Sequence, residues 1–289
     1  MNFLFISYYL LFAVLGLCVG SFINMAIYRV RHNKNFFGFS FCDYCKKPLA
    51  INALIPLFSF IAYKGKSKCC NKPLDKNMPL VEFITALAFM VLCFLYLNNY
   101  FLKYISTISL MYWVLIASIL IFLFFYDLLY FELPLIPVIL GYFLWAIYEA
   151  VKYFWLANSY SHYLLNYGLG EYLIKTNYVV NQLQFYKQDL LYTGLFAVFV
   201  TIFFLFLWGV TRGRGMGSGD VYFAPLLALI IGFPASPIYL ALSFIVGALF
   251  GILLIIFKGK NLKTAVPFGP FLIIGFLMAL TFTKLFYTF

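Results

Sequence analysis

The sequence predicts an all-α polytopic membrane protein with about eight transmembrane helices and a small cysteine-containing loop domain. Of its 289 residues, 65% are hydrophobic and only 10% are charged, which is far from the usual composition of a soluble domain. Several apolar runs exceed the roughly 18 residues needed to cross a bilayer. Residues 104–126, 190–210 and 237–257 contain no Asp, Glu, Lys or Arg. Because lipid offers no partner to an open strand edge, these runs are predicted to be helices.

Eight spans are expected, at about residues 4–28, 79–97, 104–126, 133–150, 190–210, 221–235, 237–257 and 265–283. The first has no Lys or Arg before it and is interpreted as a retained span, not a cleaved signal peptide. The span at 221–235 is the shortest, and its apolar run can cross a bilayer only if flanking residues also lie in the membrane. Residues 152–189 are rich in Tyr and Asn and are assigned to an outer loop, in which an interfacial helix is one option.

The distribution of Lys and Arg indicates which side of the membrane each loop faces. Ten of the twenty lie in the loop between the first two spans, from Arg29 to about Met78. If that loop is cytoplasmic, alternation of the spans places Arg212, Arg214, Lys258, Lys260 and Lys263 on the same side and Lys103, Lys152, Lys175, Lys187 and Lys284 outside. Fifteen against five agrees with the positive-inside rule. We therefore expect a first transmembrane helix (1–28), a cytoplasmic cysteine-loop domain (29–78) and a transmembrane domain (79–289), and no nucleic-acid partner.

Two aspartates are the candidate catalytic residues. Asp127 follows the apolar run LIFLFFY, and Asp220 ends the glycine-rich stretch GMGSGD. Acidic residues beside long apolar runs are costly and call for an explanation. The predicted topology puts both at cytoplasmic helix ends, where two carboxylates that share a proton can act as base and acid in peptide hydrolysis. Gly215, Gly217 and Gly219 lack a Cβ and would let a substrate backbone approach closely.

Other interpretations of these residues stay open. Both aspartates could be interfacial helix ends, with Asp220 as an ordinary N-terminal cap. A phosphate loop is disfavoured because the glycine stretch lacks a Gly-Lys-Ser/Thr ending and a preceding strand. The two histidines, His32 and His162, are expected on opposite sides of the membrane, which disfavours a Ser–His or Cys–His relay. A transporter that uses intramembrane acids, or an assembly scaffold, would fit the spans without proteolysis.

Four cysteines in the basic loop indicate a zinc site. Cys42 and Cys45 form a CxxC pair, and Cys69 and Cys70 follow in the same loop. Such a set suits tetrahedral zinc, and a reducing cytoplasm disfavours a stable disulfide. The pairs precede the similar turns KKPL and NKPL, as in two facing zinc knuckles. Ser67 stands where the second pair would have its first cysteine, so Cys42, Cys45 and Cys70 are favoured over Cys69, with free thiols as the alternative.

These motifs together resemble one family, the bacterial prepilin peptidases, also called type IV leader peptidases. The matching stretches are GSFINMAIYR (20–29), the CxxC at Cys42, IPLFSF (55–60), the second cysteine turn, PLVE (79–82), the Asp127 segment with Leu133-Pro134, and GMGSGD (215–220). The departures are Ser67 in place of a family cysteine and Leu135 where an aspartate often follows Leu-Pro.

The resemblance implies an activity and its partners. It implies an aspartic endopeptidase of the bacterial inner membrane that cleaves the basic leader of type IV prepilins or pseudopilins at the cytoplasmic face. Asp127 and Asp220 occupy the positions of the family's catalytic pair. The resemblance further implies methylation of the new amino terminus with S-adenosylmethionine, although the chain has no GxGxxG signature for that cofactor.

Three polar residues near the first two spans have two interpretations each. Glu82, inside the second span, is either a structural carboxylate or a contact to the positively charged substrate. With Gly217 and Gly219 it completes the set of candidate substrate-binding residues. Asn24 and Arg29 either hold methyl donor or substrate, or anchor the first span at the interface.

Overall fold

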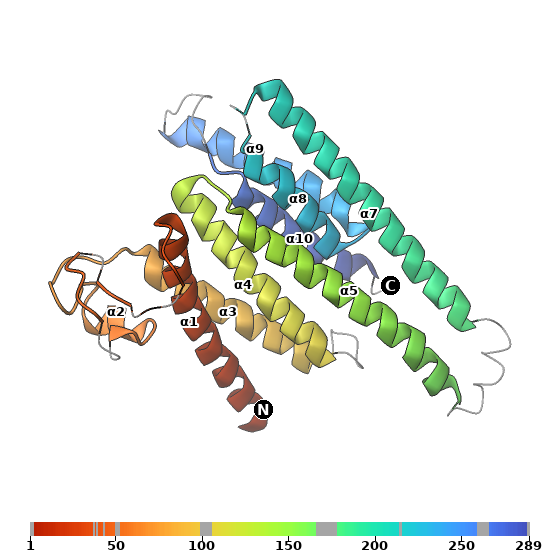
Figure 1. The fold of residues 1–289 in the computed structure, drawn as a ribbon, viewed down its shortest axis with the longest axis horizontal. Coiled ribbons are helices and arrows are strands. Elements are labelled where there is room, and N and C mark those ends of the chain that lie inside the picture. The colour runs from red at the N-terminus through yellow and green to blue at the C-terminus, as the bar shows by residue number, and fades with distance from the viewer. Residues whose placement is uncertain are drawn as a thin grey trace. The chain divides into compact units, whose positions relative to one another are not determined.

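The computed structural model describes residues 3–36, 38, 40–42, 44–49, 53–98, 106–165, 178–213, 216–258 and 266–287. Gly215 and the basic residues Lys103, Lys175, Arg214, Lys260 and Lys263 lie outside these ranges. Within them the chain is built from helices and contains no strand, so the all-α prediction is confirmed. The helices are α1 (Phe3–Arg31), α2 (Phe58–Ala62), α3 (Asn77–Leu97), α4 (Ser106–Tyr130), α5 (Leu135–Leu165), α7 (Tyr178–Thr211), α8 (Ser218–Ile231), α9 (Ala235–Lys258) and α10 (Gly269–Tyr287) (Figure 1).

The predicted number of spans needs correction. A helix coincides with each of the eight expected spans, but in the described ranges only α1, α3, α4, α5, α7 and α9 are long and apolar enough to cross a membrane. The helix α8 has 14 residues, which at 1.5 Å per residue give about 21 Å against a hydrocarbon core of about 30 Å. It ends at Gly232, whose φ of 78° is a left-handed conformation that interrupts the helix. The apolar part of α10, Gly269–Phe282, is also short.

The segment 152–189, expected as an outer loop in which an interfacial helix was one option, is helical at both ends where the structure describes it, as continuations of α5 and α7. The helix α5 continues to Leu165, and α7 begins at Tyr178. Contacts between the two helices favour this extension: the Tyr186 hydroxyl donates to the backbone oxygen of Glu149 at 3.2 Å and also to its carboxylate. Glu149 in turn pairs with Lys152 at 2.7 Å. Such pairings between distant residues leave no periodic signal in the sequence.

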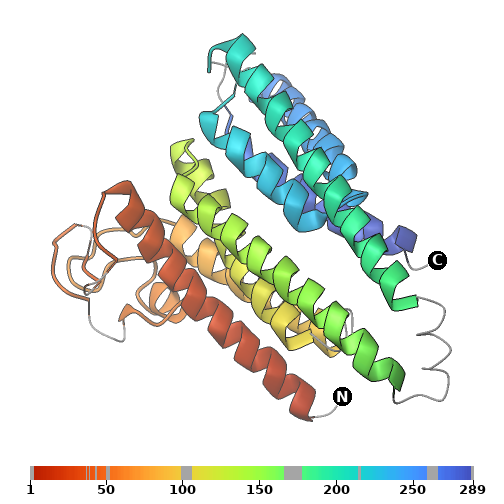
Figure 2. The same cartoon turned by 45° about the vertical axis from the view of Figure 1, so that its right-hand side comes forward.

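The chain divides into two compact units, Met1–Phe125 and Tyr126–Phe289. In the first unit, α1 and α3 lie side by side, and the loop that contains α2 follows the carboxyl-terminal end of α1 (Figures 1 and 2). A Cβ at Gly16 would lie 2.5 Å from the Ala86 Cα, and one at Gly20 would lie 2.6 Å from the Glu82 Cα. Glycines four residues apart let two membrane helices approach closely, and this contact fixes Glu82 against α1.

In the second unit, α8 packs against α5, α7, α9 and α10. Its side chains Phe223, Leu226 and Leu227 are fully buried. Hydroxyl groups from the neighbouring helices bind its backbone: Tyr142 donates to the Tyr222 oxygen at 2.9 Å, and Tyr239 donates to the Ala224 oxygen at 2.6 Å. The short helix is therefore held on several sides, and its first turn has a fixed position within this unit.

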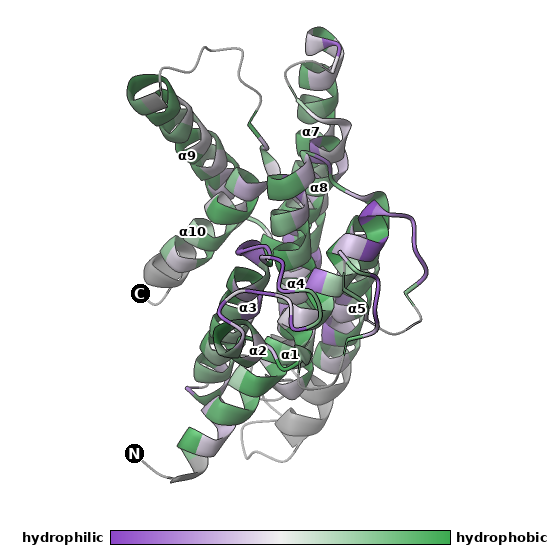
Figure 3. Ribbon diagram, turned by 90° about the vertical axis from the view of Figure 1, so that its left-hand side faces the viewer, coloured by the Kyte–Doolittle hydropathy of each residue, from purple (hydrophilic) through white to green (hydrophobic). Residues whose placement is uncertain are grey.

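The helix surfaces are apolar, as a bilayer requires. Figure 3 shows hydrophobic residues along the helices, whereas the hydrophilic residues concentrate in connecting segments. On α9 the side chains Ile245, Leu249, Ile252, Leu253 and Ile256 are exposed. Exposed apolar surface of this extent on helices of spanning length indicates a multi-pass membrane protein.

Candidate active site

Asp127 lies in the last turn of α4, just inside the second unit. Its side chain is only 4% exposed, and its Oδ2 accepts a hydrogen bond of 2.9 Å from the backbone N–H of Gly269 at the start of α10. A Cβ at Gly269 would lie 2.6 Å from the same oxygen. Only a glycine at that position lets the backbone amide come so close to the carboxylate.

Asp220 lies in the first turn of α8 and is 5% exposed. The helix is capped by Gly217 in an extended conformation, and no side chain caps it. Asp220 is therefore not the N-cap residue itself but lies three residues into the helix. The backbone amide of Gly217 lies beside the Asp220 carboxylate, and the helix dipole favours a negative charge in this turn.

The connection between α4 and α5 brings the two aspartates together. The Tyr222 hydroxyl donates to the Leu133 backbone oxygen at 2.5 Å, and a Cβ at Gly219 would lie 2.6 Å from the Leu133 Cβ. The start of α8 is thus fixed against the residues that follow Asp127. The carboxylates of Asp127 and Asp220 interact electrostatically, and two buried carboxyl groups at short range can hold one proton between them.

The glycines differ in their surroundings. Gly217 is exposed, whereas Gly219 is buried against Leu133, so of these two glycines Gly219 serves the packing of α8 and Gly217 offers an open backbone. Gly269 was missed by the sequence analysis. Its signal is the turn-forming stretch PFGP at residues 267–270, immediately before the last apolar run.

Glu82 belongs to the first unit and has several hydrogen-bond partners. Its Oε2 accepts a bond of 2.7 Å from the backbone N–H of Leu57, and the side chains of Ser21 and Asn24 also donate to its carboxylate. The Asn24 amide donates to the Met78 backbone oxygen at 2.9 Å. Glu82 therefore ties α3 to α1 and to the segment before α2.

Arg29 organises the beginning of the cysteine loop. Its guanidinium donates to the backbone oxygens of Asn35 at 2.9 Å, of Phe36, and of Gly38 at 2.8 Å, and its side chain is 4% exposed. A fork of guanidinium donors suits several acceptors at once. These contacts agree with the interpretation of Arg29 as an anchor at the end of the first span.

The four cysteines of the loop come together in space. The sulfur atoms of Cys42, Cys45, Cys69 and Cys70 all lie within 4.8 Å of one another. Four sulfurs about 2.3 Å from a tetrahedral zinc lie about 3.8 Å apart, and the Sγ atoms of Cys42 and Cys70 are 3.7 Å apart. The cluster is therefore compatible with zinc, with all four thiols as candidate ligands.

The surroundings of Cys42 favour its thiolate. Burial raises the pKa of this thiol, but hydrogen bonds from the Ser67 hydroxyl and from the backbone N–H groups of Cys45 and Tyr44 lower it to about 6. Thiolates are the form of cysteine that binds metal. The Cys42 side of the cluster is thus prepared for a cation.

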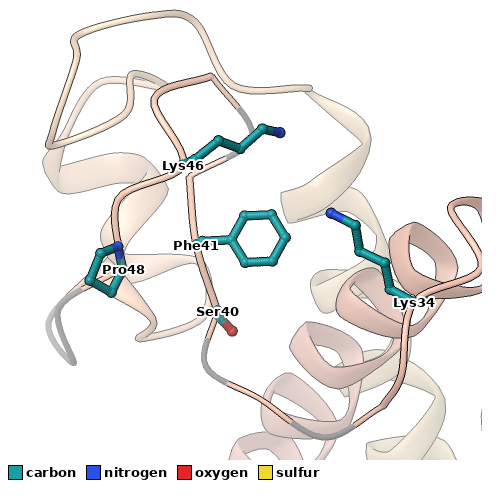
Figure 4. Close-up of a pocket in the computed structure, with 5 residues that line it drawn as sticks. All are labelled: Lys34, Ser40, Phe41, Lys46 and Pro48. Atoms are coloured by element: carbon teal, nitrogen blue, oxygen red, sulfur yellow. The ribbon is translucent and has the colours of Figure 1, made fainter.

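A separate shallow cavity of about 340 Å³ lies on the same loop (Figure 4). It is lined by Lys34, Ser40, Phe41, Lys46 and Pro48. The Lys34 ammonium lies 4.5 Å from the centre of the Phe41 ring, and that of Lys46 lies 5.6 Å from it. Two ammonium groups would repel a basic peptide, so this cavity does not suit a positively charged leader.

Fold and site together define a multi-pass membrane protein with a buried carboxylate pair in one unit and a four-cysteine loop in the other. Comparison with known proteins narrows this class. Residues 14–96 match the family model described as the bacterial peptidase A24 N-terminal domain. A prepilin leader peptidase/N-methyltransferase of Aeromonas salmonicida (strain A449) is 27% identical over 307 residues, which cover 94% of this chain and 90% of the relative.

Two further relatives carry the same description. The one from Legionella pneumophila is 28% identical over 315 residues, covering 96% of this chain and 94% of the relative. The one from Pectobacterium carotovorum is 36% identical over 107 residues, covering 29% of this chain and 38% of the relative. No solved structure matches the chain. The resemblance to the bacterial prepilin peptidases is confirmed, and it extends over nearly the whole chain.

Proposed function

We propose that this protein cleaves the leader of type IV prepilins or pseudopilins at the cytoplasmic face of the bacterial inner membrane, with Asp127 and Asp220 as catalytic residues. The observation that carries the proposal is the pair of buried, electrostatically interacting carboxylates in a chain whose relatives are named prepilin leader peptidases. Burial of two acidic side chains at helix ends is costly and is typical of a functional site.

In this mechanism the two carboxylates hold one proton between them. The ionised carboxylate takes a proton from a water molecule, which attacks the scissile carbonyl carbon, while the protonated one donates a hydrogen bond to the carbonyl oxygen. When the tetrahedral intermediate collapses, the C–N bond breaks and a proton passes to the leaving amine. The protons belong to the pair, so neither residue has a fixed role as acid or base.

The substrate is expected to bind through both its helix and its leader. A prepilin's hydrophobic helix would lie in the bilayer against this protein, which brings the leader junction level with the carboxylates, and this proximity contributes to catalysis. The exposed backbone at Gly217, next to Asp220, is the proposed contact for the substrate chain, with Gly219 supporting it. Glu82 already has three donors, so we propose that it holds the loop and acts on the leader only indirectly.

The relatives' names suggest a second activity, methylation, and the four clustered sulfurs suggest a metal site. We propose that the chain also methylates the new amino terminus with S-adenosylmethionine, and that the loop at 29–78 binds a structural zinc ion through its cysteines, between the helix at 1–28 and a peptidase domain at 79–289. When bound, zinc would crosslink the two cysteine turns. Transfer of a labelled methyl group to processed pilin by the purified protein tests the methylation separately.

The decisive experiment is cleavage of a type IV prepilin by the purified protein in detergent. With the wild type we expect the prepilin to lose the mass of its leader. For Asp127→Asn and Asp220→Asn we expect a cleavage rate about 10²–10⁴-fold lower, since each variant lacks one half of the acid–base pair. The matched control is Asp189→Asn, because Asp189 is exposed on α7.

The same experiment separates the rival functions. Cleavage by either dyad variant near the wild-type rate contradicts the catalytic pair. A wild-type protein that is folded and leaves an authentic prepilin intact instead favours a transporter, or an assembly scaffold that uses the cysteine loop to bind partners.

A further inference from the structure

The cysteine loop contains two hairpins that match residue by residue. In the first, the Cys42 N–H donates to the Lys47 oxygen at 2.9 Å and the Lys46 N–H donates to the Cys42 oxygen at 2.9 Å. In the second, Ser67 makes the corresponding bonds with Lys72 and Asn71, both at 2.8 Å.

The backbone conformation of the two hairpins confirms the register. Lys46 has a φ of 60° and Asn71 a φ of 59°. Isolated bridges join Phe41 to Pro48 and Lys66 to Pro73. Ser67 therefore corresponds to Cys42, Cys70 to Cys45, and Cys69 to Tyr44. In the second hairpin a serine therefore stands at the position where the first hairpin has its first cysteine.

Cys69 lies in the sulfur cluster although its counterpart in the first hairpin, Tyr44, is not a cysteine. Its Sγ lies 3.1 Å from the Cys45 Sγ, and it belongs to the set of four sulfurs within 4.8 Å. Tyr44, its counterpart in the first hairpin, turns away and donates to the Pro73 oxygen at 2.9 Å. Equivalent backbone positions thus direct one side chain into the cluster and the other to a backbone acceptor.

Ser67 lies between the sulfurs. Its Oγ is in hydrogen-bonding contact with the Cys42 Sγ at 3.2 Å and with the Cys69 Sγ at 3.1 Å, and its side chain is 4% exposed. A neutral hydroxyl is a poor zinc ligand beside thiolates, which form the usual four-cysteine structural sites. Its one proton can be donated to either sulfur or shared between the two, which suits the hydroxyl to hold them in position.

We infer that Cys69 supplies the fourth metal ligand in place of the cysteine missing at position 67, and that Ser67 is a positioning residue that orients Cys42 and Cys69. This inference rests on the zinc binding proposed above. The ligand set would then be Cys42, Cys45, Cys69 and Cys70, with two adjacent cysteines binding one ion.

The test is metal binding by the full-length purified protein. Zinc content is measured by mass spectrometry, zinc affinity by competition with a chelator, and the number of sulfur ligands by the intensity of the sulfur-to-cobalt charge-transfer band after cobalt substitution. The variants are Cys69→Ser, Ser67→Ala and the double variant Ser67→Cys/Cys69→Ser. Cys93→Ser is the control, because Cys93 lies within α3, outside the cluster.

We expect Cys69→Ser to weaken zinc binding by more than about 100-fold, because losing even an outer hydrogen-bond partner costs about 10–100-fold. Ser67→Ala should fall within that lower range and keep the cobalt spectrum of four sulfurs. The double variant moves the sulfur into the register of the repeat and should restore affinity to near the wild-type value.

Other outcomes overturn the inference. Wild-type affinity and an unchanged cobalt spectrum in Cys69→Ser would show that Cys69 is not a ligand, while the zinc site itself would stand. If Cys69→Ser weakens zinc binding and the double variant does not restore it, a cysteine at position 67 cannot replace the one at position 69, and the inference is contradicted. Failure of the wild type to bind zinc or cobalt would contradict both the metal site and the ligand set, and prepilin cleavage by the same sample would show that the peptidase proposal survives.

Discussion

The two units of the molecule treat buried carboxylates in different ways. In the first unit, Glu82 is surrounded by donors: the Leu57 amide and the side chains of Ser21 and Asn24. In the second unit, Asp127 accepts one bond from the Gly269 amide, and Asp220 has the Gly217 amide beside it. These two acidic groups also act on each other.

The number of hydrogen-bond donors distinguishes a structural carboxylate, Glu82, from a reactive pair, Asp127 and Asp220. A buried charge with several donors is stabilised and connects the elements that supply them. Two carboxylates with one backbone donor each keep lone pairs free for water and for a substrate, at a cost in stability that functional sites commonly carry. The number and origin of the donors, more than burial itself, distinguish the two cases.

The largest expected effect contrasts Asp220 with Glu82. Asp220→Asn should lower the rate of prepilin cleavage by about 100-fold or more, while thermal unfolding in detergent occurs at the same or a higher temperature, because a buried acidic group is replaced by a neutral one. Glu82→Gln should retain measurable cleavage but lower the free energy of unfolding by about 1–3 kcal/mol, since its amide cannot accept all three bonds. Complete loss of cleavage in folded Glu82→Gln would move Glu82 into the reaction.

The next effect concerns the glycine that contacts Asp127. In Gly269→Ala the new methyl group would lie 2.6 Å from Oδ2, so the carboxylate or α10 must shift. A displacement of about 1 Å can cost about 10²-fold in rate, and we expect kcat/KM for prepilin cleavage to fall by about 10–100-fold. Gly251→Ala is the control, since a Cβ there has nothing within 4 Å. Equal activity of the two variants would show that Asp127 tolerates the shift.

A smaller effect is expected at the contact between α1 and α3. Gly20→Ala puts a Cβ 2.6 Å from the Glu82 Cα, and overpacking of this kind costs about 1–3 kcal/mol. Chemical denaturation of the purified protein, compared with Gly194→Ala on α7, measures the difference. An unchanged midpoint would mean that the two helices separate at little cost.

The smallest effect is expected at Tyr222. Tyr222→Phe removes the hydrogen bond to the Leu133 oxygen, which is worth about 0.5–1.5 kcal/mol. Because this bond fixes the start of α8, the cleavage rate should fall only a few-fold, with KM less affected than kcat. Tyr192→Phe, at an exposed tyrosine on α7, provides the comparison. A loss as large as that of Asp220→Asn would indicate that the Tyr222 hydroxyl takes part in the chemistry.

The sequence predicted the helices and the acidic pair because both are signals of composition. In a chain with nine Asp and Glu, a carboxylate beside an apolar run is conspicuous, and Lys and Arg mark which helix ends share a side. The repeated turns of the cysteine loop were predicted from local sequence, and the structure brings their four sulfurs together.

Features that depend on distant contacts were not predictable in this way. Gly269 is 142 residues from Asp127, and no local pattern connects the two. The continuation of α7 before residue 190 is accompanied by a contact of Tyr186 with Glu149 across two helices, which local sequence does not reveal. The expected span at 221–235 is the short helix α8, because its polar first turn and its end at Gly232 are set by tertiary packing.

The short length of α8 also has a consequence for the position of the scissile peptide bond. A helix of about 21 Å is shorter than a hydrocarbon layer about 30 Å thick, and α8 is enclosed by α5, α7, α9 and α10, so its neighbours fix where its first turn lies. With Asp220 in its first turn, the packing of α8 sets where that carboxylate lies among these helices. On the proposed mechanism, that position determines which peptide bond of a membrane-embedded precursor meets the carboxylates.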